Sequence, residues 1–452
     1  MVSVVSSHGV IPSEPTPTGI FPLSDFDQIR LSSHAPLLFV YRPHFNDHAP
    51  LPFSIHTLAK SLSRALVHFY PFAGQLREIQ GGRFQLHCNA MGARLLEAVS
   101  EAKLDDLGDF QPNQDVEQLM PKIDYRLPLE EIPLLVVQLT RFRCGGLTLG
   151  VAVSRAVVDG VSAMRFVISW ARITRGEGLD LSSSEMLLRD STILDSRKPC
   201  TAPRFDHPEF SPPPLWEGSL VDAEDEADTA ILKITKNQVQ KLKEKASNFG
   251  PPRRPYTSFE VISGVLWRCA CKARYEGNGN QPTRLSTLVD CRNRLRPPLP
   301  NAFFGNVTLP TVTKTSKFDD VMSKPVSYAV GEIRQALEKL TDSYVRSALD
   351  YIAGQNDVRL LRNAGPGKFK GNPNLTLVSW MNFSFQDADF GWGKPVYMGP
   401  GNINSEGKAF LMNDGAGDGF IVAIRLQASR LAAFKKLFYE EARGMLHTTS
   451  KL

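Results

Sequence analysis

The chain has 452 residues, of which 42% are hydrophobic and 22% are charged, and its formal net charge is +5. A length above about 250 to 300 residues favours two packed lobes, and the ordinary composition excludes a disordered or fibrous chain. The 52 basic and 47 acidic residues are interspersed without a long basic run, so nucleic acid is not expected as a partner.

Alternating and helical patterns identify the first elements of the chain. Residues 55–69 carry apolar side chains at helical spacing and precede a proline, which predicts a helix that ends there. Residues 147–153 alternate apolar and small side chains, which indicates a strand, and a helical pattern begins after Gly160. Residues 154–160 are therefore predicted to form a strand-to-helix junction, from which side chains can project into a cleft.

A proline-rich and then acidic stretch at 195–228 predicts an extended crossover between the two halves of the chain. The first domain is then residues 1–194 and the second is residues 229–452. Thr235 and Gln238 form a capping-box pattern that opens a helix. Two further helices are predicted at 326–341 and 428–445, so both halves mix strands and helices in an α/β chain.

The N-terminus, the cysteines and the apolar runs bear on location. Residues 1–15 lack a basic region followed by an apolar stretch, so no secretory signal is predicted. No apolar run approaches the roughly 20 residues that span a bilayer. The six cysteines do not suggest a disulfide framework, and Cys269-x-Cys271 lacks zinc-knuckle spacing. We therefore expect a cytoplasmic monomer with no metal site and no membrane contact.

Several short stretches occur in an order that resembles one enzyme family. Residues 153–160 read VSRAVVDG, residues 389–393 read DFGWG, and between them lie YTSFE, DCRNRL and FFGN at 256–260, 290–295 and 303–306. Together they resemble the BAHD acyltransferases of plants, over a region from about residue 11 to the C-terminus. The first stretch resembles the HxxxDG motif of that family with Arg155 at the histidine position. Residues 11–19 and 397–401 most resemble the branch that makes hydroxycinnamoyl amides of polyamines.

The resemblance implies a two-domain α/β fold like that of chloramphenicol acetyltransferase, with a solvent channel between the domains. Acyl-CoA enters one mouth of the channel and an alcohol or amine enters the other. The motif histidine takes the proton of the acceptor as it attacks the thioester. The resemblance also implies that Asp159 pairs with an arginine of the second half, Arg292 or Arg294, and that Trp380 and Tyr41 contribute to the acceptor pocket. The residues of the DFGWG loop, Asp389, Gly391, Trp392 and Gly393, are expected to be structural.

Arg155 is the feature that puts ordinary family chemistry in question. A guanidinium stays protonated below about pH 12 and has no acceptor atom, so Arg155 cannot serve as a general base. Ser154 has no evident activating partner and does not replace the base, although it can contact substrate. His34 is the candidate substitute base. Arg155 itself is either an anion anchor, which binds a substrate carboxylate or donates to charge that develops in a transition state, or half of an internal salt bridge that plugs the channel.

Three functions remain open from the sequence. The one we favour is a repurposed enzyme that binds an anionic or neutral small molecule and promotes elimination, cyclisation or condensation. The second is acyl transfer with another base, for which acyl-CoA is the co-substrate and no cofactor is required. The third is a catalytically silent metabolite-binding protein. All three remain open because a fold alone does not determine function.

Overall fold

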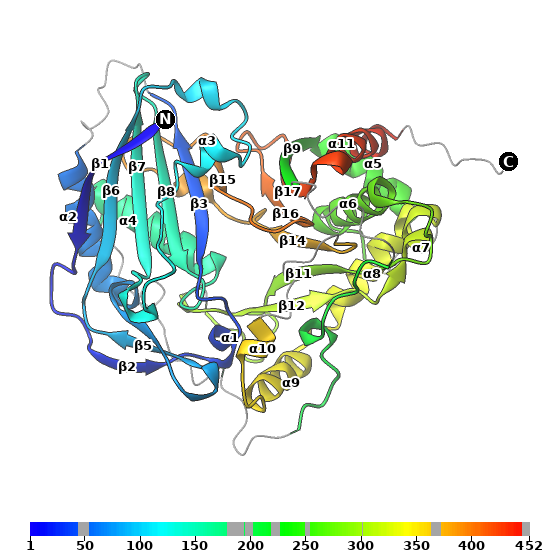
Figure 1. The fold of residues 1–452 in the computed structure, drawn as a ribbon, viewed down its shortest axis with the longest axis horizontal. Helices are drawn as coiled ribbons and strands as arrows, with labels where there is room; N and C mark the ends of the chain where they lie inside the picture. Colours follow the sequence, from blue (N-terminus) through cyan, green and yellow to red (C-terminus); the bar gives the residue numbers. More distant parts are fainter. Residues whose placement is uncertain are drawn as a thin grey trace.

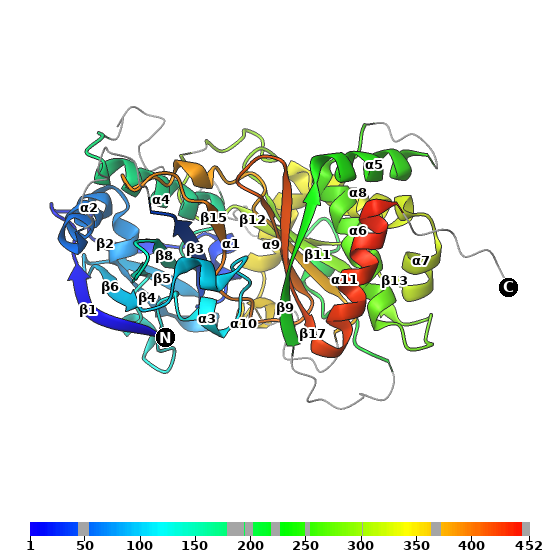
Figure 2. The same cartoon turned by 90° about the horizontal axis from the view of Figure 1, so that it is seen from above.

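The computed structural model describes residues 1–43, 54–178, 194, 202–217, 227–248, 254–300, 302–362 and 372–444. They form two lobes that lie side by side, each built on a six-stranded sheet (Figure 1, Figure 2). This agrees with the predicted two-domain α/β architecture. None of the helices in the described ranges has both the length and the apolar character that crossing a bilayer requires.

The sheet of the first lobe has the strand order β1-β6-β7-β8-β3-β15. Its strands are β1 (Val2–Val10), β6 (Ala93–Ser100), β7 (Leu135–Phe142), β8 (Leu147–Ser154), β3 (His34–Tyr41) and β15 (Tyr397–Pro400). Helices α2 (Ile55–His68) and α4 (Gly160–Thr174) pack with it into one hydrophobic core. Both helices and strand β8 were predicted from the spacing of their apolar residues.

The sheet of the second lobe has the strand order β12-β11-β14-β16-β17-β9. Its strands are β12 (Thr308–Val312), β11 (Leu285–Asp290), β14 (Leu375–Ser379), β16 (Lys408–Asn413), β17 (Gly419–Gln427) and β9 (Ala227–Thr235). Helices α5 (Lys236–Ser247), α6 (Ser258–Arg274), α8 (Val326–Glu338) and α11 (Ala428–Arg443) lie on the side of this sheet that faces away from the first lobe (Figure 1). The capping box predicted at Thr235 is present and opens α5.

Strands β14 and β16 determine what lies between the lobes, because their side chains alternate between two faces. Leu375 and Leu377 of β14 belong to the core beneath the helices, as does Leu411 of β16. Phe410 and Met412 of β16 belong instead to the core of the first lobe. The second sheet therefore presents alternate residues to the first lobe, and these residues form the wall of the space between the lobes.

The division of the sequence into lobes is less clean than the predicted boundary at 195–228. Strand β15 comes from the second half of the chain, yet it pairs with β3 of the first sheet, with Tyr397 opposite Val40. In the predicted crossover, residues 208–210 form a short 3₁₀ helix. Residues 195–201 and 218–226 of that stretch lie outside the described residues.

The remaining elements are small and lie around the two main sheets. They are β2 (Gly19–Pro22), β4 (Gln75–Glu78), β5 (Phe84–Cys88), β10 (Pro282–Thr283), β13 (Ser316–Lys317), α1 (Asp25–Gln28), α3 (Gln114–Glu117), α7 (Phe318–Ser323), α9 (Asp342–Ala353) and α10 (Arg359–Arg362). Helices α1 and α9 help to form a third apolar cluster. The five cysteines in the described ranges are free thiols.

Candidate active site between the lobes

A cavity of about 390 Å³ lies between the two sheets. It is lined from the first lobe by strands β3 and β8 and the start of α4, and from the second lobe by β11, β12, β14 and β16. This volume falls in the range of pockets that hold small organic ligands. The cavity occupies the place where the sequence predicted an interdomain channel.

Strand alternation decides which predicted residues reach this cavity. Ala35 and Leu37 of β3 and Val153 of β8 line it. His34 and Ser154 are paired across these two strands, and neither is among the lining residues. Ser154 is buried, and its hydroxyl has no hydrogen-bond partner. The expected contact of Ser154 with substrate is therefore not what the structure shows, because its side chain lies on the other face of β8.

Arg155 follows strand β8 and lines the cavity. Its backbone N–H donates to the carbonyl oxygen of Ser33 at 3.0 Å, and its Nε donates to that of His34 at 3.2 Å. No carboxylate in the described ranges forms an ion pair with its guanidinium. Burial lowers the pKa of Arg155 below its ordinary value of 12.5, and Arg30 adds to that decrease. The alternative of a channel plugged by an internal salt bridge finds no partner among these residues.

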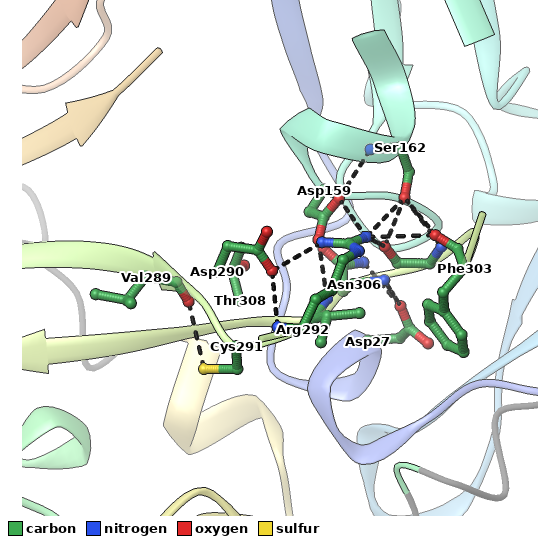
Figure 3. A network of polar contacts seen from close by, with 12 residues as sticks. Asp27, Asp159, Ser162, Val289, Asp290, Cys291, Arg292, Phe303, Asn306 and Thr308 are labelled. Carbon is green, nitrogen blue, oxygen red and sulfur yellow. Dashed lines mark hydrogen bonds and ion pairs between the residues drawn. The ribbon is translucent and has the colours of Figure 1, made fainter. Parts of the chain in front are cut away.

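Asp159 lies four residues further along and is also among the lining residues, but its carboxylate is engaged by Arg292 and by backbone N–H groups. Its side chain caps α4 by accepting from the backbone N–H of Ser162 at 3.0 Å. It also accepts from the guanidinium of Arg292 at 2.8 Å (Figure 3) and from the N–H of Val307 at 2.9 Å. Burial by itself would raise the pKa of Asp159, but Arg292 and the donated hydrogen bonds lower it below 3.8.

The partner of Asp159 is Arg292, and Arg294 has another task. Arg292 is 1% exposed and also reaches Asp290 at 3.0 Å (Figure 3). Arg294 donates to the carbonyl oxygens of Leu337 and Leu340 at 2.8 and 3.0 Å. The sequence left the two arginines as alternatives, and the geometry assigns the ion pair to Arg292.

Asn306 was missed by the sequence reasoning, although it lies within one of the family-like stretches. Its side-chain amide donates to Asp27 at 2.8 Å and to the backbone oxygen of Arg155 at 3.0 Å. Asp27 in turn accepts from the backbone N–H of Asn306 at 3.1 Å (Figure 3). These contacts tie the backbone of Arg155 to both lobes and fix where its side chain begins.

His34 is held by its neighbours on both sides of the ring. Its Nε2 lies 2.8 Å from the carbonyl oxygen of Pro133, and its Nδ1 lies 3.0 Å from the hydroxyl of Tyr125. Because a carbonyl can only accept, Nε2 carries the proton and Nδ1 accepts from Tyr125. Burial lowers the pKa of His34 to about 4; the hydrogen bond to the Pro133 carbonyl opposes part of this decrease, and nearby Arg155 adds a smaller decrease of its own. His34, the predicted substitute base, therefore has both ring nitrogens engaged in hydrogen bonds, and it is not among the residues that line the cavity.

Trp380 lies where the sequence placed it, and Tyr41 does not. Trp380 lines the cavity and packs against Phe383 and Phe410, with ring centroids 5.9 and 4.8 Å away. Tyr41 is 1% exposed, and its hydroxyl donates to the backbone oxygen of Ala388 at 2.8 Å. Tyr41 therefore supports the loop before residue 389 and is not part of the cavity wall.

The DFGWG loop is organised by Asp389. One oxygen of its carboxylate accepts from the backbone N–H groups of Gly391 and Gly393, at 2.8 and 3.0 Å. Both glycines have positive φ angles, +94° and +87°, which side chains with a Cβ rarely adopt. Trp392 packs edge-on against Tyr41, with ring centroids 5.3 Å apart. These contacts fit the structural role expected for Asp389, Gly391, Trp392 and Gly393.

The cavity is rich in basic side chains that the sequence reasoning did not single out. Besides Arg155, the lining residues include Arg30, Arg284, Arg362 and Lys408. Burial lowers the pKa of Lys408 to about 7, and Arg155 adds to the decrease. No group of three or more histidine, cysteine or acidic residues that could hold a metal ion occurs among the described residues.

Comparisons with known proteins place this geometry in a family. Residues 1–441 match the model of the family described as "Transferase family". The chain is 44% identical to hydroxycinnamoyl-CoA:piscidic acid hydroxycinnamoyltransferase of Actaea racemosa, covering 98% of this chain and 100% of that protein. It is 38% identical to shikimate O-hydroxycinnamoyltransferase of Nicotiana tabacum, covering 97% and 99%.

Two solved structures share the fold. Vinorine synthase superimposes with a TM-score of 0.71 at 23% identity and covers 99% of both chains. The TRI101 protein of F. graminearum, solved with coenzyme A and T-2 mycotoxin, gives a TM-score of 0.76 at 18% identity, covering 92% of this chain and 96% of that one. Enzymes of the matched family use acyl-CoA as co-substrate and need no cofactor. The chain belongs to the transferase family of plant BAHD acyltransferases.

Proposed function

We propose that this chain transfers a hydroxycinnamoyl group from coenzyme A to a small acceptor that carries a carboxylate, and that Arg155 holds this carboxylate. The observation that carries the proposal is the guanidinium of Arg155, which lines the cavity and has no carboxylate partner among the described residues. A buried cation without a partner is costly, and a bound carboxylate removes that cost. The planar guanidinium can donate two parallel hydrogen bonds to a carboxylate.

The acceptors named for three of the similar proteins are carboxylic acids. They are piscidic acid, shikimate and 5-hydroxyanthranilate. An anionic acceptor also fits the cavity, where the arginines that line it, Arg155 and Arg30 among them, would repel a polyammonium at close range. We therefore favour a carboxylate-bearing acceptor over the polyamine suggested by residues 11–19 and 397–401.

The cavity walls suggest how the two substrates are oriented. Trp380, Phe383 and Phe410 form an aromatic wall from the second lobe, which suits a planar hydroxycinnamoyl group or an aromatic acceptor. With its carboxylate on Arg155, the acceptor places its hydroxyl or amine near the thioester carbonyl. This fixed geometry supplies part of the rate by proximity. Arg155 cannot take the acceptor's proton, because its guanidinium has no acceptor atom.

A second candidate rests on the same cation. A guanidinium that holds a carboxylate or an enolate also suits elimination, cyclisation or condensation without external acyl transfer. The specific observation in its favour is that Arg155, at the motif position where the resemblance expects the base, can only donate. A silent binder would use the same anchor, so turnover decides between these readings.

The experiment follows free coenzyme A in the wild type and in Arg155→His. Each is offered coumaroyl-CoA with piscidic acid or shikimate as anionic acceptors, and with spermidine or agmatine as cationic ones. We expect the wild type to release coenzyme A with the anionic acceptors and not with the cationic ones. A wild type that is inert with every acceptor, while Arg155→His transfers the acyl group, would contradict the proposal and favour the repurposed enzyme.

A further inference from the structure

Lys408 is the first residue of β16 and lines the same cavity as Arg155. Alternation along the strand explains its direction, because Ala409 and Leu411 pack beneath the helices whereas Phe410 faces the first lobe. Its ammonium nitrogen lies 5.2 Å from the centre of the Phe410 ring. Lys408 is therefore an amine in the space between the sheets, on the wall that also carries Trp380.

No carboxylate near Lys408 is free to pair with it. Three carboxylates line the cavity, and each is held elsewhere: Asp159 and Asp290 bind Arg292, and Glu209 binds His207 and Tyr344. Glu406, two residues before Lys408, pairs with Arg274 at 2.5 Å. Among the residues that the structure describes, Lys408 has no ion-pair partner.

The other groups that face Lys408 are neutral or positive. Its neighbour on β14 is Thr376, and its neighbour on β17 is Arg425. Arg155 lies in the same cavity and acts on Lys408 electrostatically. A guanidinium keeps its proton at any physiological pH, so the mutual repulsion can only be relieved by the lysine. Burial acts in the same direction and lowers the pKa of Lys408 to about 7.

We propose that Lys408 is the general base of the acyl transfer, and that its neutral amine takes the proton which Arg155 cannot accept. The inference rests on the proposed function. The acceptor's O–H or N–H proton passes to Nζ of Lys408 as its oxygen or nitrogen bonds to the thioester carbonyl carbon. The C–S bond then breaks, and the ammonium of Lys408 returns the proton to the thiolate of coenzyme A. A neighbouring cation suits a lysine to this role because it lowers the lysine pKa toward the operating pH, where a general base is most effective.

The arrangement gives the two basic side chains different tasks that depend on each other. Arg155 stays charged, binds the acceptor's carboxylate and holds Lys408 in its neutral form. Binding of that carboxylate offsets part of the repulsion, so the pKa of Lys408 is expected to rise in the complex. His34 does not compete for the role, because both of its ring nitrogens are engaged outside the cavity.

The test compares Lys408→Met and Lys408→Arg with the wild type and with Lys436→Met. Met keeps the length of the side chain without a proton acceptor, and Arg keeps the charge without one. Lys436 lies on α11 with a side chain that is 77% exposed, so it controls for the loss of one surface lysine. Coenzyme A release is measured from pH 5.5 to 8.5, and thermal unfolding shows that each variant is folded.

We expect kcat/KM of the wild type to rise with pH through a single ionisation near 7. Lys408→Met and Lys408→Arg should both lose that rise and fall by about 10²- to 10⁴-fold, the usual contribution of a general base. Lys436→Met should behave as the wild type. If Lys408→Arg keeps the wild-type rate and pH profile, the residue supplies only charge and the inference is overturned.

A second measurement reads Lys408 without turnover. The lysines are reductively methylated with carbon-13 formaldehyde and a borohydride reductant, the Lys408 resonance is identified by its absence in Lys408→Met, and its shift is followed with pH. Titration near 7 supports the inference, and titration at the ordinary value of lysine overturns it. A wild type that releases no coenzyme A with any acceptor overturns the proposed function and this role with it, whereas retained turnover in Lys408→Met overturns only this role.

Discussion

Arg155 is placed by hydrogen bonds of its backbone and of its side-chain Nε. Its N–H is bound by Ser33, its carbonyl oxygen by Asn306, and its Nε by the carbonyl of His34. Among the described residues, the two terminal nitrogens of the guanidinium donate no hydrogen bond, and Arg155 lines the cavity. Because the side chain is already held, it loses less conformational entropy when a carboxylate binds.

Arg155→Ala should therefore weaken binding of the anionic acceptor by about 1.5 to 3 kcal/mol, the range for hydrogen bonds to charged groups. Calorimetric titration of the acceptor gives this number. The matched control is the methyl ester of the same acceptor, which lacks the negative charge. Wild type and Arg155→Ala should bind the ester with nearly equal affinity. An acceptor affinity that does not change in Arg155→Ala would rule out the anchor.

At the scale of elements, the ion pair between Asp159 and Arg292 joins helix α4 of the first lobe to the loop after β11 of the second. The side chains of both residues are at most 2% exposed. The guanidinium also binds Ser162 at 3.0 Å, on the first turn of α4. The strand-to-helix junction that carries Arg155 is therefore held by the neighbouring lobe.

Asp159→Asn should destabilise the chain by about 3 to 5 kcal/mol, because it leaves the buried charge of Arg292 without its main partner. Unfolding in guanidinium chloride measures the change. Asp290→Asn is the control, since Asp290 is 38% exposed and an exposed pair contributes about 0 to 1 kcal/mol. A fully stable but inactive Asp159→Asn would instead make Asp159 a catalytic residue.

The DFGWG loop offers a second prediction at this scale. Tyr41→Phe removes the hydroxyl that binds the Ala388 carbonyl, so a buried acceptor loses its partner. We expect a loss of about 1 to 3 kcal/mol in the free energy of unfolding and no change in KM for the acceptor. A raised KM at unchanged stability would return Tyr41 to the substrate-binding residues that the sequence suggested.

The sequence could predict elements far better than it could predict which face of an element meets the cavity. Apolar spacing and the capping box at Thr235 identified α2, β8, α4 and α5, because these signals are local. Strand β3 is buried on both faces, so its pattern does not tell whether His34 or Ala35 faces the other lobe. Lys408 was missed because a lysine at the start of a strand usually lies in solvent, and its cavity exists only once two distant sheets meet.

At the scale of the whole molecule, the weak net charge of +5 conceals a concentrated positive field. Four arginines line the cavity, namely Arg30, Arg155, Arg284 and Arg362, and the three carboxylates there are all paired. A cleft of one sign with low-dielectric walls raises the local concentration of ligands of opposite charge. The phosphates of coenzyme A and the carboxylate of an acceptor both carry that opposite charge.

The lowered pKa values of His34 and Asp159 make the stability of the folded chain depend on pH. The pKa of His34 in the folded chain is about 4, below its ordinary 6.5, so the unfolded chain binds more protons in between. Stability present above pH 6.5 is therefore lost as the pH falls through this window, and Asp159, whose pKa is also lowered, continues the loss at still lower pH.

Lys408 extends this dependence to neutral pH and provides the last prediction. Its pKa is about 7 in the folded chain and 10.5 ordinarily, so the unfolded chain binds more protons between these values. The free energy of unfolding should rise with pH above 7, by at most about 1.4 kcal/mol per pH unit for one proton. The buried thiols of Cys271 and Cys291, with pKa values of about 12, act in the opposite sense above about pH 8.5.

The measurement is urea unfolding of the wild type and of Lys408→Met between pH 6.5 and 8.5. Because both proteins contain all the other titratable groups, the difference between their free energies of unfolding isolates the contribution of Lys408. The difference between the two should shrink as the pH rises, because the variant loses a charge whose burial is costly only when it is protonated. Parallel curves would mean that Lys408 stays charged throughout and would leave the cavity without a neutral amine.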